Sequence, residues 1–195
     1  SGQSSPVFGT VLFGRMGGGE GADSAMGMFI NSLPIRIEVG NQPVREALKT
    51  THARLVALLR HEHASLAQAQ RCSAVPAGAP LFTAMLNYRY TGQAGVEELQ
   101  ARTGMRVLGG KERSNYPFSL SIDDDGRALT LVPQVDVRIG ARRVADLVQQ
   151  ALQVLADALQ QATPVAIDTL SVLPGHERER LARWGGNAPV YSTER

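Results

Sequence analysis

The sequence predicts an α/β fold, and three observations lead to that prediction. Short β-rich runs occur in both halves of the chain, and runs with helical periodicity lie between them. The chain has 195 residues and is 43% hydrophobic and 19% charged, which provides enough apolar material for a core. Its length fits one domain with an appendage, or a part of something larger.

The first half of the chain predicts two strands followed by two helices. Val7 to Phe13 is a β-rich run, and the alternating run from Leu33 to Val39 predicts a second strand. Pro34 cannot donate a ladder hydrogen bond, so it must lie at the start of that strand or on a sheet edge. After Pro43, apolar residues recur at helical spacings of three and four. These residues are Val44, Leu48, Thr51, Leu55, Leu58 and Leu59. A shorter helix is predicted over Ser65 to Arg71.

The second half predicts a hairpin and the longest helix. Residues 81–90 predict a strand, the polar segment 92–104 has no clear pattern, and RVLGG at 106–110 predicts a short strand. Two β runs flank Asp125-Gly126, which is the strongest hairpin signal in the chain. One apolar stripe then predicts a helix that packs on the core. Its members are Val144, Leu147, Val148, Ala151, Leu152, Leu155 and Leu159.

The last segment of the chain changes in character. Gln161 to Pro164 ends the long helix. Residues 165–195 then contain a short β-like piece, a charged helix after Pro174 and a tail without periodicity. This composition favours an interdomain linker over the end of a compact fold.

Composition and charge argue against several classes of protein. The 20 basic and 18 acidic residues leave a net charge of +2, and the arginines are scattered, so nothing indicates nucleic-acid binding. No apolar stretch approaches the roughly 18 residues of a membrane span, and the N-terminal SGQSSPVFG lacks the features of a signal peptide. Cys72 is the only cysteine; we interpret it as a packed core residue, with a nucleophile as the alternative. These features predict a soluble cytoplasmic protein.

Residues 14–22 read GRMGGGEGA and raise the question of phosphate binding. The glycine spacing fits a dinucleotide fingerprint, and Glu38 stands where a ribose-binding acid would be expected. Such a fold needs a crossover helix, but only Asp23 to Ile30 is available and Gly27 interrupts it. No Walker lysine follows the glycines either. We therefore interpret the glycines as a turn from a strand into a short helix, and not as a nucleotide site.

The histidines and serines complete no catalytic or metal site by their spacing. His61 and His63 are two residues apart and fall on different faces of a helix, so they cannot share a metal ion there. No two histidines stand at i and i+4, and one cysteine cannot complete a zinc set. No Gly-x-Ser-x-Gly nucleophile elbow is present. Composition alone leaves a Ser-His-Asp arrangement open.

Several segments together resemble the signatures of nonribosomal peptide synthetase condensation domains. FGTVLFGR at 8–15 is followed by MGMFINSLPIR at 26–36, which is similar to the family pattern Gly-x-Phe-Val-Asn-Thr-x-x-x-Arg. The matching residues are Gly27, Phe29, Asn31 and Arg36. Ile30 and Ser32 replace the Val and Thr of the pattern.

Three further segments continue the resemblance in the family's order. RHEHASLAQAQRC at 60–72 looks like the next family segment. KERSNYPFSLSID at 111–123 resembles a later one, with Arg113, Asn115 and Pro117 in register. LSVLPGHERERLARWGGN resembles the linker that joins a condensation domain to an adenylation domain. The family's catalytic His-His-x-x-x-Asp-Gly motif does not occur in the sequence.

The resemblance implies a fold and a division of the chain. The fold is a chloramphenicol acetyltransferase-like α/β lobe, with a mixed β-sheet and flanking helices. Condensation domains are pseudodimers of two such lobes, and the histidine motif belongs to the N-terminal one. The resemblance therefore implies the C-terminal lobe over residues 1–164 and a linker towards an adenylation domain over residues 165–195.

The resemblance also implies a transferase that joins two thioesters held on carrier proteins. The acceptor amine attacks the donor thioester carbon, and an amide forms. This lobe would supply one wall of the substrate tunnel and would be inactive alone, because the histidine motif lies elsewhere. The implied partners are the N-terminal lobe, the donor and acceptor carrier proteins and the downstream adenylation domain. No cofactor or metal is expected to bind directly, since the phosphopantetheine of the carriers holds the substrates. No nucleic acid or membrane is expected as a partner.

The expected tunnel or lobe-junction residues follow from the matched motifs. They are Gly14, Arg15, Phe29, Asn31, Ser32, Arg36, Arg113 and Asn115. We expect Arg15 and Arg36 to support structure, and Asn31 to affect turnover more than folding. No catalytic residue is expected in this chain. Two alternatives stay open: a non-catalytic carrier-protein-binding module and a small stand-alone acyltransferase.

Overall fold

The computed structural model describes residues 4–15, 21, 24–76, 78–90, 101, 103–105, 108, 110 and 112–186. In chain order the described strands are β1 (Val7–Leu12), β2 (Asn31–Arg36), β3 (Ala84–Tyr90), β4 (Phe118–Asp124) and β5 (Leu129–Val135). The helices are α1 (Val44–Leu59), α2 (Leu66–Arg71), α4 (Ala141–Gln160), the 3₁₀ turn η2 (Ile167–Thr169) and α5 (Gly175–Gly185). The class is mixed α/β, as predicted. Most of RVLGG at 106–110 and of the polar segment 92–104 lies outside the described residues.

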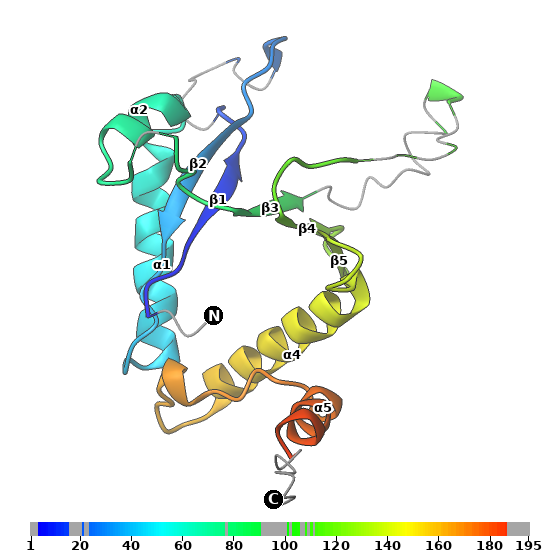
Figure 1. Cartoon of the computed structure of the whole chain (residues 1–195). Helices are drawn as coiled ribbons and strands as arrows, with labels where there is room; N and C mark the ends of the chain where they lie inside the picture. The colour runs from blue at the N-terminus through cyan, green and yellow to red at the C-terminus, as the bar shows by residue number, and fades with distance from the viewer. Residues whose placement is uncertain are drawn as a thin grey trace, which may run out of the picture.

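The strands form one mixed sheet in the order β2-β1-β3-β4-β5 (Figure 1). β1 pairs antiparallel with β2 and parallel with β3, while β4 pairs parallel with β3 and antiparallel with β5. Pro34 lies in the edge strand β2, as expected for a residue without a ladder donor. That strand begins at Asn31 and not at Leu33, because Asn31 already pairs with Leu12.

The predicted hairpin around Asp125-Gly126 is confirmed by the antiparallel pairing of β4 with β5. The Asp125 carboxylate closes the loop, since its Oδ1 accepts hydrogen bonds from the N–H groups of Ala128 at 2.7 Å and Arg127 at 2.8 Å. These bonds stabilise the charged form and hold the pKa of Asp125 below its ordinary value.

Four predicted helices are also present, and α1, α2 and α5 begin where the sequence favours a helix start. α1 follows Pro43 and α5 follows Pro174, because proline fixes a φ that suits the first turn. The hydroxyl of Ser65 caps α2 by accepting a hydrogen bond from the Gln68 N–H at 3.1 Å. α4 covers the predicted apolar stripe over its whole length.

Side chains alternate between the two faces of the sheet, and α1 and α4 lie on only one of them. We call the helix side the apolar face; its strand residues include Phe8, Leu12, Leu33, Ile35, Leu86, Leu120 and Leu131. We call the opposite side the polar face. Its residues include Gly9, Val11, Ser32, Met85, Asn87, Arg89, Ser119, Ser121, Asp123 and Gln134.

The two long helices lie at opposite edges of the apolar face and leave its middle uncovered (Figure 1). α1 packs on β2 and α4 packs on β5. The helices meet where Arg45 Nη2 donates to the carbonyl oxygen of Leu159 at 3.0 Å. Between them a cavity of about 210 Å³ remains over the central strands. It is lined by Phe8, Ala84, Met85, Leu86, Phe118 and Leu120.

The apolar stripes predicted on α1 and α4 are therefore only partly buried. Val44 and Val144 are buried in the core, but Leu48 is 55% exposed and Leu152 is 40% exposed. The prediction that the α4 stripe is core packing holds for the residues that face β5 and α1. The rest of the stripe has no cover within the described residues.

Two expectations about local structure are wrong. The described residues 24–30 form no α-helix and run as irregular backbone into β2, because so short a segment with a glycine in its middle is a poor helix former. Cys72 is exposed and not buried, since it is the C-cap of a six-residue helix at the surface. The β-like piece after α4 is reduced to a single bridge between Pro43 and Ala166, followed by η2.

α5 is attached to α4 by an ion pair between Glu177 and Arg143. Glu177 is 2% exposed. Arg143 Nε donates to Glu177 Oε1 at 2.9 Å, and Arg143 Nη2 contacts the same oxygen. The Arg143 guanidinium holds the pKa of Glu177 below its ordinary value. Helix α5, which lies in the predicted linker, is therefore docked on α4.

Candidate functional site

A cavity of about 280 Å³ opens on the polar face of the sheet, above β3 and β4. Alternate strand residues form its floor, and the segment 112–116 forms one wall. The lining residues are Val11, Met85, Asn87, Glu112, Arg113, Ser114, Tyr116, Ser119, Leu120, Ser121 and Gln134. A neighbouring cavity of about 460 Å³ shares the wall and extends towards the end of β5. The polar face thus carries a continuous hollow.

Strand pairing brings the floor residues together. Met85 pairs with Ser119 and Asn87 pairs with Ser121, so these four side chains lie on one face. β5 adds Gln134, which pairs with Ser119 from the other side. The floor is therefore fixed by backbone hydrogen bonds of three adjacent strands.

The two serines of the floor are buried and have no partner inside the described part of the chain. Ser119 is 8% exposed and Ser121 is 6% exposed. Among the described residues, neither hydroxyl has a hydrogen-bond partner, and the same holds for the Asn87 amide. The serine hydroxyl oxygens are not among the fully enclosed polar atoms without a partner, and Asn87 is only half-buried. All three groups can therefore be reached by a molecule that enters the cavity.

An aromatic pair supports the wall of the cavity. The rings of Phe82 and Tyr116 stack with their centroids 5.4 Å apart and an interplanar angle of 23°. Phe82 lies directly on β1 at Gly9, where an added Cβ would overlap the ring. Glycine at this position lets the ring approach the sheet, and the stacked tyrosine is held beside the floor.

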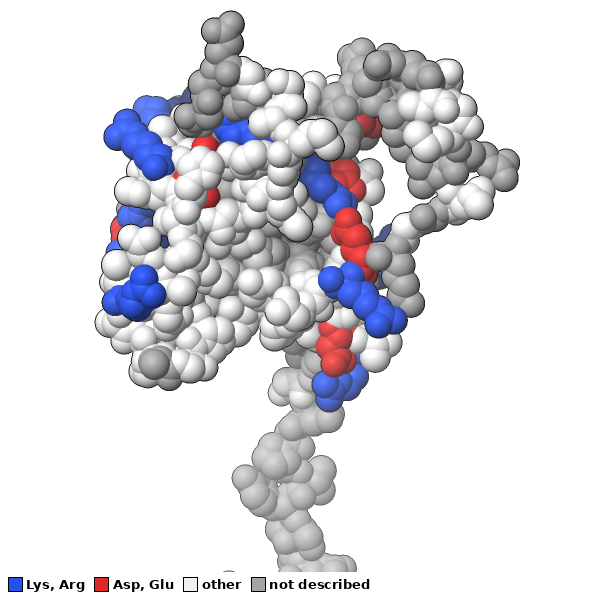
Figure 2. All heavy atoms as spheres, turned by 90° about the horizontal axis from the view of Figure 1, so that it is seen from above, with Lys and Arg blue, Asp and Glu red and all other residues white. Residues whose placement is uncertain are grey.

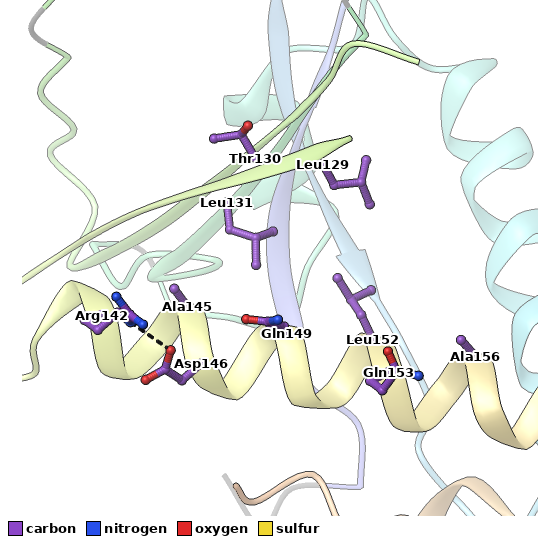
Figure 3. A pocket seen from close by; sticks show the side chains of 10 residues that line it. All are labelled: Leu129, Thr130, Leu131, Arg142, Ala145, Asp146, Gln149, Leu152, Gln153 and Ala156. Atoms are coloured by element: carbon purple, nitrogen blue, oxygen red, sulfur yellow. Dashed lines mark hydrogen bonds and ion pairs between the residues drawn. The ribbon is translucent and has the colours of Figure 1, made fainter. Parts of the chain in front are cut away.

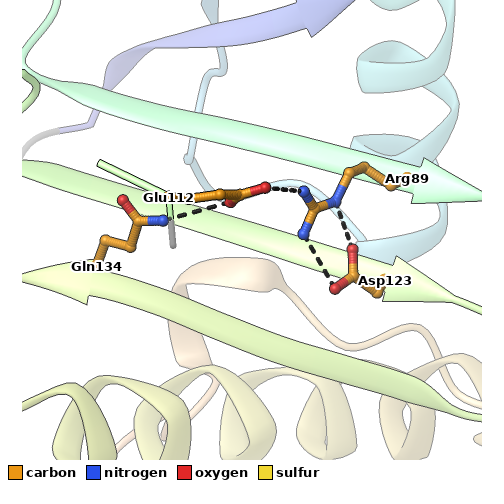
Figure 4. A network of polar contacts seen from close by, with 4 residues as sticks. All are labelled: Arg89, Glu112, Asp123 and Gln134. Atoms are coloured by element: carbon orange, nitrogen blue, oxygen red, sulfur yellow. Dashed lines mark hydrogen bonds and ion pairs between the residues drawn. The ribbon is translucent and has the colours of Figure 1, made fainter. Parts of the chain in front are cut away.

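A network of charged side chains borders the cavity (Figure 4). Arg89 Nε donates to Asp123 Oδ1 at 2.5 Å, and Arg89 Nη2 donates to Asp123 Oδ2 at 3.1 Å. Arg89 Nη1 donates to Glu112 Oε1 at 2.5 Å, and Gln134 Nε2 donates to Glu112 Oε2 at 3.4 Å. The bonds to Asp123 and Glu112 raise the pKa of Arg89 above its ordinary value. The network ties the wall to three strands, and it contains one cation and two carboxylates, so it carries one more negative than positive charge.

Arg113 and Asn115, both expected from the motifs, lie on the wall segment. Arg113 lines both cavities, and among the described residues it has no ion-pair partner. Asn115 is exposed and lines neither cavity. Of the two, only Arg113 is placed at the candidate site.

Gly14, Arg15 and Phe29 form a separate cluster beyond the end of β1. Gly14 has φ +67°, and an added Cβ would overlap the backbone oxygen of Phe29. The guanidinium of Arg15 lies over the Phe29 ring, 5.0 Å from its centroid, which is a cation–π geometry. This contact joins the two ends of the connection between β1 and β2. Residues 16–20, 22 and 23 of that connection lie outside the described residues.

Asn31 and Ser32 are neighbours in β2 but face different sides of the sheet. Asn31 Nδ2 donates to the carbonyl oxygens of Glu62 at 2.9 Å and Ala64 at 2.7 Å. Its Oδ1 accepts from the Ser32 N–H at 2.9 Å. Asn31 thus fixes the loop between α1 and α2 to the sheet, while Ser32 pairs with Val11 at the border of the cavity.

Arg36 lies at the far end of β2 and is part of a surface network. Arg36 Nη2 lies 3.5 Å from Glu38 Oε1, and Arg54 Nη2 lies 2.9 Å from the same oxygen. Arg54 Nη1 also donates to the Arg36 carbonyl oxygen at 2.7 Å. The hydrogen bond from Arg54 lowers the pKa of Glu38. Both Glu38 and Arg36 are engaged in binding α1 to β2, away from the cavity.

Motif matching therefore missed most of the floor of the cavity, whose polar residues are Asn87, Ser119 and Ser121. A signal for them exists in the sequence PFSLSID, where Ser119, Ser121 and Asp123 alternate with large apolar residues. That period of two predicts one polar face of a strand. It does not reveal that two serines would be buried beneath a wall from another segment.

A second hollow lies between β5 and α4 and has a different character (Figure 3). It measures about 680 Å³. Leu129 and Leu131 point from β5 towards the helix, and Leu152 points back from α4. Arg142 and Asp146 form an ion pair at one end, with Nε and Oδ1 3.0 Å apart. Thr130, Gln149 and Gln153 also line this groove, so apolar and polar side chains are mixed in it.

Basic and acidic side chains are mixed on the surface of the molecule. On the face viewed in Figure 2, blue and red side chains lie near one another along the border, and the middle is formed by other residues.

Within the described part of the chain, no group of three or more His, Cys, Asp or Glu side chains could hold a metal ion. The helices of that part include none that is long and apolar enough to cross a membrane.

Sequence comparison supplies relatives for this arrangement. The chain is 46% identical over 181 residues to malpibaldin synthetase from Mortierella alpina, which covers 93% of this chain and 3% of that protein. It is 45% identical over 192 residues to malpinin synthetase from the same organism, covering 98% of this chain and 2% of that protein. Nonribosomal peptide synthetase 5 from Gibberella zeae is 26% identical over 185 residues, which is 93% of this chain and 2% of that protein. The chain thus spans only a few per cent of these relatives.

Solved structures share the fold at low sequence identity. A mutant of the starter condensation domain of rhizomide synthetase, in complex with C8-CoA and Leu-SNAC, matches with a TM-score of 0.67 and 19% identity. The match covers 89% of this chain and 40% of that chain. A four-domain nonribosomal peptide synthetase bound to AMP and glycine matches with a TM-score of 0.63 and 15% identity, over 90% of this chain and 14% of that one.

The mixed sheet with helices on one face thus has the fold of part of a solved condensation domain. The family model described as "Condensation domain" matches residues 1–181. The chain belongs to the condensation-domain family of nonribosomal peptide synthetases.

Proposed function

We propose that this chain forms one wall of the tunnel in which a condensation domain joins two carrier-bound thioesters. The single observation that carries the proposal is the family match over residues 1–181. In this proposal residues 1–164 are the C-terminal lobe, and residues 165–195 lead towards an adenylation domain. The family assignment does not favour a separate carrier-binding module or a stand-alone acyltransferase.

The proposed reaction is amide formation between an acceptor aminoacyl thioester and a donor aminoacyl or peptidyl thioester. The acceptor nitrogen attacks the donor carbonyl carbon, a C–N bond forms, and the C–S bond to the donor phosphopantetheine breaks. The nitrogen loses a proton and the donor sulfur leaves as a thiol. Holding two tethered reactants together supplies much of the rate. The chain itself binds no cofactor in this scheme.

The polar face is the part of the lobe that fits a tunnel wall. The opposite face is apolar and carries α1 and α4. The polar face has a hollow lined by serine, asparagine and glutamine side chains, with Arg113 at its rim. Such a surface can accommodate an amide-rich substrate arm, because neutral donors and acceptors replace the water that the arm loses.

The proposal requires partners that cover much of this chain. Large apolar side chains are exposed on both long helices, among them Leu48 on α1 and Leu152 on α4, and groups of exposed apolar side chains commonly mark a surface that a partner covers. We propose that the N-terminal lobe, with the catalytic histidine motif, provides part of the cover. The donor and acceptor carrier proteins and the adenylation domain complete the assembly, in the cytoplasm.

The test compares this chain with the condensation domain of its parent synthetase. Both are incubated with donor-loaded and acceptor-loaded carrier proteins, and amide product is measured by mass spectrometry. The parent domain should form product, and the chain alone should form none above the no-protein control. Turnover by the chain alone would contradict the placement of the base outside it. Absence of product from an intact parent domain would contradict amide formation.

A further inference from the structure

We propose that the polar cavity above β3 and β4 receives the side chain of an amino acid being joined, and that Ser119 and Ser121 select neutral, hydrogen-bonding side chains. This inference rests on the proposed function and adds a substrate class to it. The side chain could belong to the donor or to the acceptor residue. Both present the same chemistry to the cavity, and the experiment below distinguishes them.

The unused polar groups of the floor carry this proposal. Both serine side chains are more than nine-tenths buried, and within the described residues their hydroxyls have no partner. The Asn87 amide lies beside Ser121 through the strand register. Three polar groups at one end of a cavity can bind a hydroxyl or carboxamide at several points. An apolar side chain would leave all three without a partner.

The charges around the cavity disfavour an ionised side chain. Arg89 is bound by Asp123 and Glu112 in the border network, so this cation is not available to a ligand. Both carboxylates are likewise engaged. Arg113 lines the cavity at its rim, and its charge offsets the second carboxylate of the network. Both Arg113 and Glu112 are exposed, so an ion pair with either group would contribute little and would not repay the hydration that a charged side chain loses on the floor.

The cavity of about 280 Å³ is the part of the continuous hollow that lies over the two serines, beside the neighbouring part of about 460 Å³. A substrate arm that follows the hollow can place one side chain over this floor. The Phe82–Tyr116 stack and the Arg89 network hold the wall in place. The limit on side-chain size is thus set by rigid neighbours, and added bulk on the floor should narrow the range of substrates.

The experiment uses the full parent synthetase and measures kcat/KM for matched substrates. In one arm the donor residue is varied with a glycyl acceptor, and in the other the acceptor is varied with a glycyl donor. Threonine and valine form the key pair, since they have nearly the same shape and differ by a hydroxyl. Glycine reports the rate when the cavity is empty, and lysine and aspartate report the effect of charge.

Two variants of Ser121 and one control variant complete the design. Ser121→Ala should reduce the threonine-to-valine ratio by about 2- to 10-fold in one arm only, because it removes one neutral hydrogen bond. Ser121→Leu should lower the rate for large side chains relative to glycine by about 10-fold or more. The control position is Thr130 on β5, which pairs with Asp123 and does not line the cavity. Thr130→Leu adds similar bulk there. It should leave both ratios unchanged.

The outcomes separate this inference from the proposed function. Unchanged threonine-to-valine ratios in both arms, with an active Ser121→Ala variant, would overturn the inference while amide formation stands. A preference of the parent for lysine or aspartate in the affected arm would also overturn it. Ser121→Leu could fail to fold, which its melting temperature would reveal, and Ser121→Ala then decides alone. Loss of all product in the unsubstituted parent would instead contradict the proposed function.

Discussion

At the scale of single residues, Gly14 shows how a motif position can be required for geometry. Its φ of +67° lies in the left-handed region, and the Phe29 carbonyl oxygen occupies the space that a Cβ would need. The position is thus constrained twice, by backbone conformation and by a close contact. The motif match identified Gly14, but the sequence does not contain the contact that explains it.

We predict that Gly14→Ala destabilises the chain more than Gly78→Ala does. Both glycines have positive φ, so each substitution carries a conformational cost of about 1–2 kcal/mol. Gly78 has no atom within 4 Å of an added Cβ, whereas at Gly14 the Phe29 oxygen fills that space. The difference in the free energy of unfolding, measured by urea denaturation, isolates the clash. Equal losses would show that the segment around Phe29 moves aside freely.

Glu177 is a second residue whose role follows from its contacts. It is almost completely buried on α5 and paired with Arg143 of α4. Because Arg143 lowers its pKa in the folded state, the pair stabilises docking above the unfolded pKa of about 4.5. This contribution is lost as the pH falls through the lower folded value. Charge in the helix GHERERLARWG predicts an exposed surface, and the sequence offers no sign that one carboxylate is buried.

We predict that Glu177→Gln weakens the packing of α5 on α4 at neutral pH. The free energy of unfolding of the variant should also fall less than that of the unsubstituted chain as the pH is lowered. Trp184, the only tryptophan, lies on α5 with the Arg180 guanidinium 4.6 Å from its ring centroid. Its fluorescence during denaturation therefore reports on that helix. The difference in the free energy of unfolding between the variant and the unsubstituted chain should be largest at pH 7 and should shrink below about pH 4.5. Glu179→Gln, an exposed position on the same helix, serves as the control. A constant difference at all pH values would contradict the role of the ion pair.

At the scale of elements, hydrophobic period and turn chemistry predict most of the fold. The hairpin between β4 and β5, the start of α1 after Pro43 and the edge position of Pro34 all follow from local sequence. The parallel pairing of β3 with β1 and β4 does not, because it joins distant segments. The candidate cavity depends on that pairing. Its floor was therefore not predictable from motif spacing, although each strand was.

Asn31 links three elements and gives an element-scale prediction. We expect Asn31→Asp to lower the free energy of unfolding by about 1–3 kcal/mol, because a carboxylate cannot donate to the Glu62 and Ala64 carbonyl oxygens. This differs from the expectation from the motif, in which Asn31 acts on turnover more than on folding. Asn115→Asp makes the same chemical change at an exposed position and should stay within about 0.5 kcal/mol of the unsubstituted chain.

The two expectations for Asn31 are separated by measuring stability and turnover together in the parent synthetase. A fall in melting temperature with a proportionate fall in product would support the role of Asn31 in fixing the loop between α1 and α2. Lost turnover with unchanged melting temperature would support the expectation from the motif instead.

At the scale of the whole molecule, the apolar face is the least complete part of the structure. α1 and α4 cover its two edges, and an apolar cavity remains above the central strands. Both helices also carry exposed leucines, Leu48 on α1 and Leu152 on α4. The chain corresponds to 40% of a solved condensation-domain chain. The remainder of the domain is the natural source of the missing cover.

We therefore predict that the isolated chain binds a hydrophobic dye and self-associates as its concentration rises, whereas the parent condensation domain does neither. Burying apolar surface is worth about 25 cal/mol per Å², so an uncovered sheet face favours any apolar partner, including a second copy. Dye fluorescence and sedimentation velocity at several concentrations measure both effects. Replacing the exposed Leu48 and Leu152 by Gln should reduce both effects, because these are exposed apolar side chains on the two helices that flank the sheet face. The same change at Leu173, 36% exposed between η2 and α5, should matter less. A monomeric chain that binds no dye would mean that the apolar face closes on itself, and the rest of the domain would then not be needed to cover it.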